Sequence, residues 1–269
     1  MKLTITILIS VILLYPHIVK GRTVIDFCER SLVYRKYFPP IQRCLTAAFE
    51  MMLEKLSIKE KKEIRVLVDI GLQDIKAVGC QSEEFIPVEK TREGNIYTQG
   101  LAALLLDRGH PFNKHYHFRV LISANYLLKH LWFDPHPQSR TLPIPPGEKV
   151  DALSVFLHEI FHALAFNGWL DSKTGLSKSI NNARSVYDKH VMAHEGQLFF
   201  NGPRAREVYG GPVPLNIRNY KHYGNKTGPG ADLAGQLMFG EFYRFRYRFS
   251  VSLLDLAILE DCGLKIKER

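Results

Sequence analysis

One short segment of the chain carries residue types and a spacing that suit metal chemistry. It reads His158-Glu159-Ile160-Phe161-His162. Residues four apart on an α-helix lie one above the other, so both imidazoles can reach the same metal ion. Glu159 points about 100° around the helix from His158 and can hydrogen-bond a water without ligating the metal. Because such polar groups are costly to bury in an apolar helix, we expect His158 and His162 to be ligands and Glu159 to be the general base.

A catalytic zinc ion needs a third protein ligand and one open position, and the residues alone leave that ligand open. His190 and His194 are again four residues apart and could form a second site if their segment is helical. His222 lies in a loop rich in Gly and Asn. A carboxylate is the alternative, and Glu195 or Glu241 could provide it. The remaining histidines after residue 21 are expected at the surface, as a solvated pair or beside turns: His115 and His117, His110, His130 and His136.

The elements that must position these residues follow from hydrophobic periodicity and turn residues. Residues 150–166 are almost wholly apolar apart from the site residues, which predicts a buried helix ending at Asn167-Gly168. Ser252 precedes Asp255 by three residues, a capping-box pattern that predicts a final helix. The other expected elements are a helix at 44–56, buried strands at 64–72 and 118–124, an ambiguous segment at 97–106, a proline-rich loop at 132–147, and long loops at 171–189 and 202–230.

The composition is that of a globular protein. Of 269 residues, 46% are hydrophobic and 23% are charged, which excludes a disordered, collagen-like or multi-span membrane protein. The formal net charge of +9 invites a nucleic-acid partner, but the basic residues are spread along the chain. One basic cluster, in residues 242–249, alternates strictly with aromatic residues, which favours a strand with one buried face over a nucleic-acid binder. We therefore expect no nucleic-acid partner.

Residues 1–21 have the pattern of a secretory signal. A basic start precedes an apolar run from Leu3 to Tyr15, and Gly21 is a small residue at the expected cleavage site. The run is shorter than the roughly twenty residues that cross a bilayer, and no second run of that length follows. The mature protein is therefore expected to be secreted or periplasmic, with no transmembrane segment. Cleavage removes Lys2 and Lys20 and no acidic residue, which lowers the formal charge from +9 to +7.

Export also determines what is expected of the cysteines. All four follow the signal, and an oxidising compartment favours two disulfides among them. Three connectivities are possible for four cysteines, and the sequence does not choose among them. The cysteines are Cys28, Cys44, Cys80 and Cys262. Asn225-Lys226-Thr227 is a glycosylation acceptor sequence for a host that uses it.

Several segments together resemble those of leishmanolysin-like metzincins. The residues that carry the resemblance are His158 to Phe166, the distant His222, Leu237-Met238 and a final helix from Leu253 to Asp261. Residues 197–215 are similar to a segment of related exported bacterial metalloproteases, and the resemblance covers roughly residues 132–263. Two positions depart from the family pattern. Ala165 stands where the family has a glycine, and Gly168 stands where simple metzincins carry their third histidine.

The resemblance implies a ligand set, a fold and an activity. His222 would be the third zinc ligand after an insertion of 59 residues, and Met238 would supply the methionine turn, an apolar floor beneath the zinc. The fold would be an α+β, two-lobed zincin: a signal at 1–21, a sheet and zinc-binding helix at 22–168, and a loop-rich lobe at 169–269. The expected function is a Zn²⁺-dependent endopeptidase acting on protein or peptide substrates. The alternatives are an inactive zincin-fold binding protein, a metallopeptidase with a carboxylate ligand, and a basic nucleic-acid or membrane-surface binder.

Overall fold

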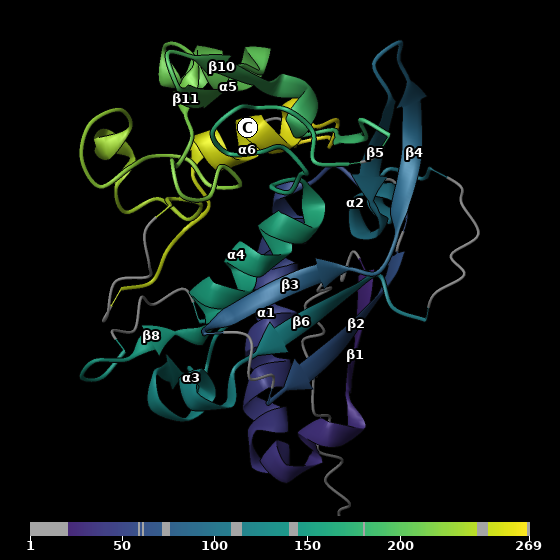
Figure 1. Cartoon of the computed structure of the whole chain (residues 1–269). Coiled ribbons are helices and arrows are strands. Elements are labelled where there is room, and N and C mark those ends of the chain that lie inside the picture. Colours follow the sequence, from purple (N-terminus) through teal and green to yellow (C-terminus); the bar gives the residue numbers. More distant parts are fainter. Residues whose placement is uncertain are drawn as a thin grey trace, which may run out of the picture.

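A four-stranded sheet occupies the first half of the chain (Figure 1). The computed structural model describes residues 21–58, 60, 62–71, 76–108, 115–139, 145–179, 181–240 and 247–267. The strand order is β1-β2-β6-β3, in which β1, β2 and β6 are parallel and β3 is antiparallel to β6 at the edge. The strands are β1 (Gly21–Phe27), β2 (Lys62–Ile70), β6 (Phe118–Ile122) and β3 (Val78–Ser82).

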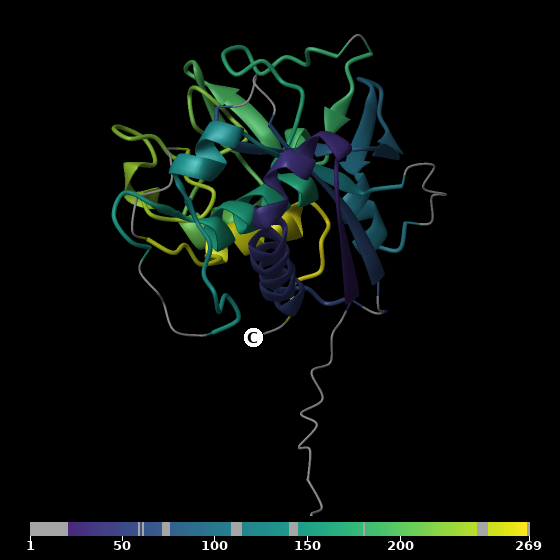
Figure 2. The ribbon, with the colours of Figure 1, turned by 90° about the horizontal axis from the view of Figure 1, so that it is seen from below.

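Alternation of side chains gives this sheet one apolar face. In β2, Ile64, Val66 and Val68 are fully buried, while the alternating positions Glu63 and Arg65 are exposed. Helix α1 (Phe38–Lys55) covers the apolar face and buries most of its own apolar side chains there. Figure 2 shows α1 nearly end-on beside β1. Burial of one sheet face and one helix stripe therefore forms the first part of the core.

Helix α4 (Ala152–Leu164) packs against both α1 and β3 and is buried along almost its whole length. Its N-terminus is capped by Asp151, whose carboxylate accepts a hydrogen bond from the backbone N–H of Ser154. The guanidinium of Arg248 bonds both Asp151 and Asp134 at 2.8 Å in a nearly water-free network. This buried ion pair joins the start of α4 to the segment that precedes the final helix.

Smaller elements surround this central layer. A second sheet has the order β4-β5-β9 and a third has the order β10-β11-β12. The bounds are β4 (Phe85–Lys90), β5 (Asn95–Gln99), β9 (Arg184–Ser185), β10 (Val191–His194), β11 (Gln197–Phe200) and β12 (Val213–Pro214). A parallel pair is formed by β7 (Leu131–Trp132) and β8 (Val150–Asp151).

The C-terminal elements gather at the C-terminal end of α4 (Figure 1). There α5 packs on α6, and α6 begins with a complete capping box between Ser252 and Asp255. The remaining helices are α2 (Gly100–Leu105), α3 (Ala124–Lys129), α5 (Pro203–Tyr209), α6 (Leu253–Asp261) and the 3-10 helices η1 (Glu29–Tyr37), η2 (Asp188–His190) and η3 (Ala231–Leu233). One apolar cluster runs through the sheet, α1, α4 and these C-terminal elements.

The structure is a mixed α and β fold with several mixed sheets, which agrees with the expected α+β class. The predicted helices and buried strands are present with shifted ends, and segment 97–106 divides into the end of β5 followed by α2. The long-loop prediction is only partly right, because 171–189 contains β9 and 202–230 contains α5 and β12. In segment 242–249, residues 242–246 lie outside the described part, and residues 247–249 form no strand.

All four cysteines are free thiols in the structure, so the prediction of two disulfides is not met. The physical reason is that each thiol lies against a different part of the fold. The thiol of Cys44 in α1 faces the carbonyl oxygen of Asp134, and that of Cys80 in β3 faces Glu159 in α4. Residues 1–20, which are all of the proposed signal except Gly21, lie outside the described residues. Within the described part, no helix is both long enough and apolar enough to cross a bilayer.

Candidate metal centre

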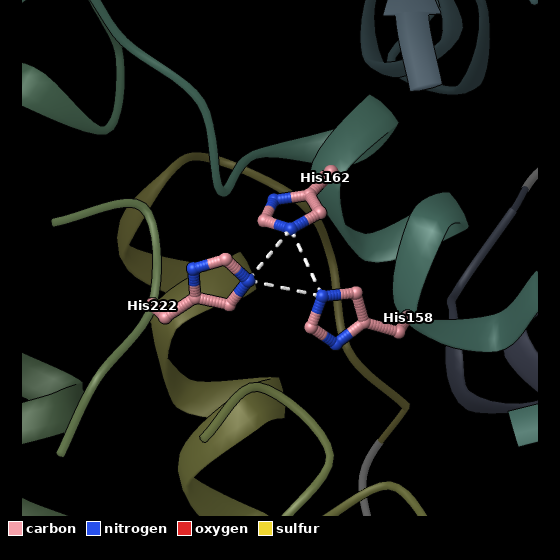
Figure 3. A group of neighbouring side chains, drawn as sticks. All are labelled: His158, His162 and His222. Atoms are coloured by element: carbon pink, nitrogen blue, oxygen red, sulfur yellow. Dashed lines mark hydrogen bonds between the residues drawn. The ribbon is translucent and has the colours of Figure 1, made fainter. Parts of the chain in front are cut away.

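Three histidine side chains from two distant segments meet at one point (Figure 3). His158 and His162 come from consecutive turns of α4, and His222 comes from the loop after β12. Their Nε2 atoms form a nearly equilateral triangle with sides of 3.0, 3.1 and 3.1 Å. The structure therefore brings together the three histidines that the sequence nominated as ligands. They are the only such group of three or more metal-binding side chains in the described part of the chain.

The outer ring nitrogens decide where the protons on two of these rings lie. Nδ1 of His158 is 2.8 Å from the carbonyl oxygen of Leu237, and Nδ1 of His162 is 2.6 Å from that of Phe166. A carbonyl oxygen can only accept a hydrogen bond, so both Nδ1 atoms carry the proton. In the neutral rings both Nε2 atoms are then unprotonated, and they lie 3.0 Å apart. Metal-ligating histidines are held in this way, with the outer N–H donated to a carbonyl oxygen.

The close approach of the three Nε2 atoms brings nitrogen lone pairs near one another, and a bound cation would remove the repulsion between them. Burial lowers the pKa of His158 to about 4 and that of His222 to about 3, and it also holds the pKa of His162 well below its ordinary value. All three rings are therefore neutral near pH 7, and His222 can offer at most one N–H to the other two lone pairs. Nδ1 of His222 is itself buried and makes no hydrogen bond with the described residues.

The size of the triangle suits zinc. A point equidistant from the three nitrogens lies about 1.8 Å from each, close to the Zn–N bond length of about 2.0–2.1 Å. The three histidines could therefore hold a zinc ion, and three protein ligands are the number found in catalytic zinc sites. Three neutral imidazoles are also a donor set that zinc accepts well.

The loop that carries His222 is fixed by hydrogen bonds on both sides of the histidine. The Asn216 backbone N–H donates to the carbonyl oxygen of His222, and the Tyr223 N–H donates to that of Met238. Tyr223 is fully buried, and its hydroxyl donates to the Asp255 carboxylate in α6 at 2.6 Å. Met238 is fully buried too, next to Leu237, whose carbonyl oxygen bonds His158. The segment that the resemblance marked as a methionine turn therefore contacts the histidine cluster through its backbone.

Glu159 lies beside the cluster and is not one of its members. Its side chain is 5% exposed, and burial raises its pKa to about 8, opposed by a hydrogen bond with the Cys80 thiol. A carboxyl group with a pKa near neutrality can both accept and return a proton. Cys80 was expected only as a disulfide partner, and its contact with Glu159 was not foreseen. Cys80 reaches Glu159 because β3 lies at the edge of the sheet. Only a prediction of the long-range pairing of β3 would have placed the thiol there.

A cleft of about 720 Å³ surrounds these residues. One wall is the edge strand β3 with the residue before it, and the opposite wall is formed by the loops around His222 and Met238. His158, Glu159, His162 and His222 all line this cleft. Because β3 pairs on only one side among the described strands, its outer edge is open to another extended chain.

The other candidate ligands lie elsewhere. His190 and His194 do not share a helix: His190 ends the 3-10 helix η2 and bonds the carbonyl oxygen of Asp261, and His194 ends the strand β10. The second site is therefore not formed. Glu195 is exposed in the turn after β10. His117 is buried and accepts a hydrogen bond from the Arg65 N–H, so the expectation of a solvated pair with His115 is wrong for it. The candidates Glu241 and His110 lie outside the described residues.

The end of α4 also differs from the expectation. The helix ends at Leu164, earlier than the predicted Asn167-Gly168. The carboxamide of Gln99 donates to the carbonyl oxygen of His162 at 2.6 Å, and the ring of His162 takes the carbonyl oxygen of Phe166. These two bonds satisfy the carbonyl oxygens of His162 and Phe166, in and just after the last turn of the helix. Comparison with protein-family models, curated proteins and solved structures found no match to this chain.

Proposed function

We propose that this chain is an exported zinc-dependent endopeptidase of the metzincin type. The observation that carries the proposal is the triangle of Nε2 atoms from His158, His162 and His222, which lie within 3.0–3.1 Å of one another at the wall of the cleft. The adjacent Glu159 carboxyl group and the open edge of β3 in the same cleft support peptide hydrolysis. The antiparallel edge strand beside parallel strands, the helix with two of the histidines and the buried Met238 support the metzincin assignment.

His158, His162 and His222 would hold the ion. Zinc bound by three imidazoles with an open position polarises a carbonyl group and lowers the pKa of water towards neutrality. Glu159 takes a proton from the attacking water and returns it to the leaving amine. The substrate backbone pairs with the outer edge of β3, which holds the peptide extended across the cleft.

The test combines metal analysis with a cleavage assay on the purified chain. Wild-type protein is expected to bind one zinc per chain and to cleave a peptide library in a chelator-sensitive manner. Glu159→Gln should keep the zinc and lose at least a hundredfold in cleavage rate, because the proton carrier is gone. His222→Ala should lose the zinc, whereas Glu195→Ala, a change at an exposed residue away from the cluster, should keep it. Undiminished cleavage by Glu159→Gln would contradict the mechanism, and zinc binding without any cleavage would favour a binding protein.

A further inference from the structure

A second hollow of about 820 Å³ adjoins the metal cleft. Three residues of the His222 loop, Arg218, Asn219 and Lys221, line both hollows and form the wall between them. Nothing in the mechanism above uses this second space. Its position directly beside the cleft makes it accessible to a peptide that lies across the metal site.

Aromatic rings form the opposite side of the second hollow. The ring of Trp169 packs edge-on against Phe85 and Tyr97, with ring centroids 4.9 and 5.9 Å apart. The backbone N–H of Trp169 donates to the buried carboxylate of Asp188, whose other oxygen accepts from the Tyr220 hydroxyl. Asp188 thus hydrogen-bonds both the aromatic side of the hollow and the His222 loop. Contacts within the fold therefore define the shape of the hollow.

Both hollows are lined by more basic than acidic side chains. Among the described residues, Glu159 is the only acidic side chain that lines either hollow. Lys178 lines the second hollow but is neutralised by Asp171 at 3.3 Å. Arg218 is exposed and Lys221 is half-buried, and neither forms a salt bridge with the described part of the chain, although Asp188 attracts Lys221 at longer range. Two cations without a salt-bridge partner among the described residues therefore lie on the wall between the hollows, which favours an anionic group there.

The segment from β3 to the start of β4 leads from one hollow to the other. Cys80 in β3 lines the metal cleft, and Phe85, at the start of β4, lines the second hollow. A strand advances about 3.3 Å per residue, so these positions are at most about 17 Å apart. A peptide paired with β3 would therefore present a side chain to the second hollow within a few residues of its scissile bond.

We propose that the second hollow is a specificity pocket for an acidic side chain of the peptide substrate, with Arg218 and Lys221 pairing its carboxylate and Trp169 packing on its apolar stem. The pocket takes Glu or Asp a few residues from the cleaved bond, and it disfavours Lys or Arg there. This assignment rests on the proposed peptidase function, but peptide binding can be measured without any cleavage.

The test uses the fluorescence of Trp169 as a direct reporter of the pocket. The chain has two tryptophans, so Trp132→Phe leaves Trp169 as the only one, and Glu159→Gln prevents turnover. Peptides that differ only by Glu, Gln or Lys at one position, moved through the sequence in turn, are titrated into this protein loaded with zinc. At one position the Glu peptide should bind about fivefold more tightly than the Gln peptide, the gain of a partly exposed ion pair. Added salt should reduce that preference.

Matched variants separate this pocket from general attraction to a basic protein. Arg218→Gln should remove most of the Glu-over-Gln preference, whereas Arg206→Gln, at an exposed residue of α5 that lines neither hollow, should leave it unchanged. Lys221→Gln should act as Arg218→Gln does, with the zinc content measured alongside because His222 is its neighbour. Equal affinities for the Glu and Gln peptides, equal effects of Arg218→Gln and Arg206→Gln, or no fluorescence change with any peptide would each overturn the assignment.

Cleavage by the wild-type chain is measured on the same peptides. A protein that binds Glu peptides selectively but cleaves none contradicts the peptidase function and leaves the acidic pocket in place. A protein that cleaves Glu, Gln and Lys peptides with equal kcat/KM retains the peptidase function and contradicts the pocket. The two proposals can therefore fail separately.

Discussion

At the scale of single residues, Asp188 connects the two segments of the chain that carry the histidines, although it lies outside the motif His158 to His162. Its buried carboxylate accepts hydrogen bonds from the backbone N–H groups of Trp169 and Ser185 and from the Tyr220 hydroxyl. Trp169 follows α4, and Tyr220 lies two residues before His222. Asp188 therefore holds the end of the segment with two of the histidines against the loop that supplies the third.

Gly168 is required by this carboxylate rather than by its own backbone angles. A Cβ at Gly168 would lie 1.9 Å from Oδ1 of Asp188. The change Gly168→Ala is therefore expected to lower the free energy of unfolding by about 1–3 kcal/mol, because the crowded carboxylate must leave its partners. Urea unfolding of the two proteins measures this difference.

The matched control is Gly211→Ala, because a Cβ at Gly211 meets no atom within 4 Å. We expect that change to alter stability by less than about 0.5 kcal/mol. Equal stability losses in the two variants would show that Asp188 does not restrict the residue at position 168. Sequence patterning places Gly168 after the helix but gives no sign of Asp188, because that contact joins residues 20 positions apart through tertiary structure.

At the scale of elements, α6 supports the site from behind. Asp255 belongs to its capping box, accepting hydrogen bonds from the backbone N–H and the hydroxyl of Ser252, and it also accepts one from the hydroxyl of Tyr223, the residue after His222. Burial outweighs these bonds and raises the pKa of Asp255 to about 6, from an ordinary value of 3.8. The helix cap and the position of the His222 loop thus share one titrating carboxyl group.

The raised pKa of Asp255 predicts the direction of a pH effect on stability. The folded chain holds this proton more tightly than the unfolded chain, so the contribution of Asp255 is full below about pH 4 and is lost as the pH rises towards 6. A shift of about two pKa units corresponds to at most about 3 kcal/mol. Urea unfolding of wild-type protein and Asp255→Asn at several pH values between 4 and 7 should show a smaller fall of stability with pH in the variant. Parallel curves would contradict the assignment of a raised pKa to Asp255.

The scale of the whole molecule shows why the sequence pointed to the three histidines that meet in the structure but not to their surroundings. The spacing of His158 and His162 follows from helix geometry, and the apolar segment around them identifies the helix. Residues 78–82 have no long apolar run, and they become the cleft wall only because β3 pairs with β6. The thiols likewise could be counted but not placed, because helices and strands far apart in the chain determine their neighbours. Local sequence patterns therefore predict the helix and the spacing of its histidines. The cleft depends on the pairing of β3 with β6, which no local pattern predicts.

The three histidines of the triangle come from parts of the chain that are far apart, so an ion bound there should stabilise the entire fold. His162 and His222 are separated by 59 residues and belong to α4 and the loop after β12. A ligand that binds only the folded state adds about 4 kcal/mol when its concentration is a thousand times its Kd. Saturating zinc is therefore expected to raise Tm by several degrees over chelator-treated protein. Removing the chelator and adding zinc again should restore the higher value.

The Tm gain should vanish in His222→Ala and persist in His190→Ala. His190 is a half-buried histidine outside the triangle, bonded to the carbonyl oxygen of Asp261. An equal zinc-dependent gain in both variants would place the ion away from His222, and no gain in the wild-type protein would mean that the three imidazoles hold no zinc.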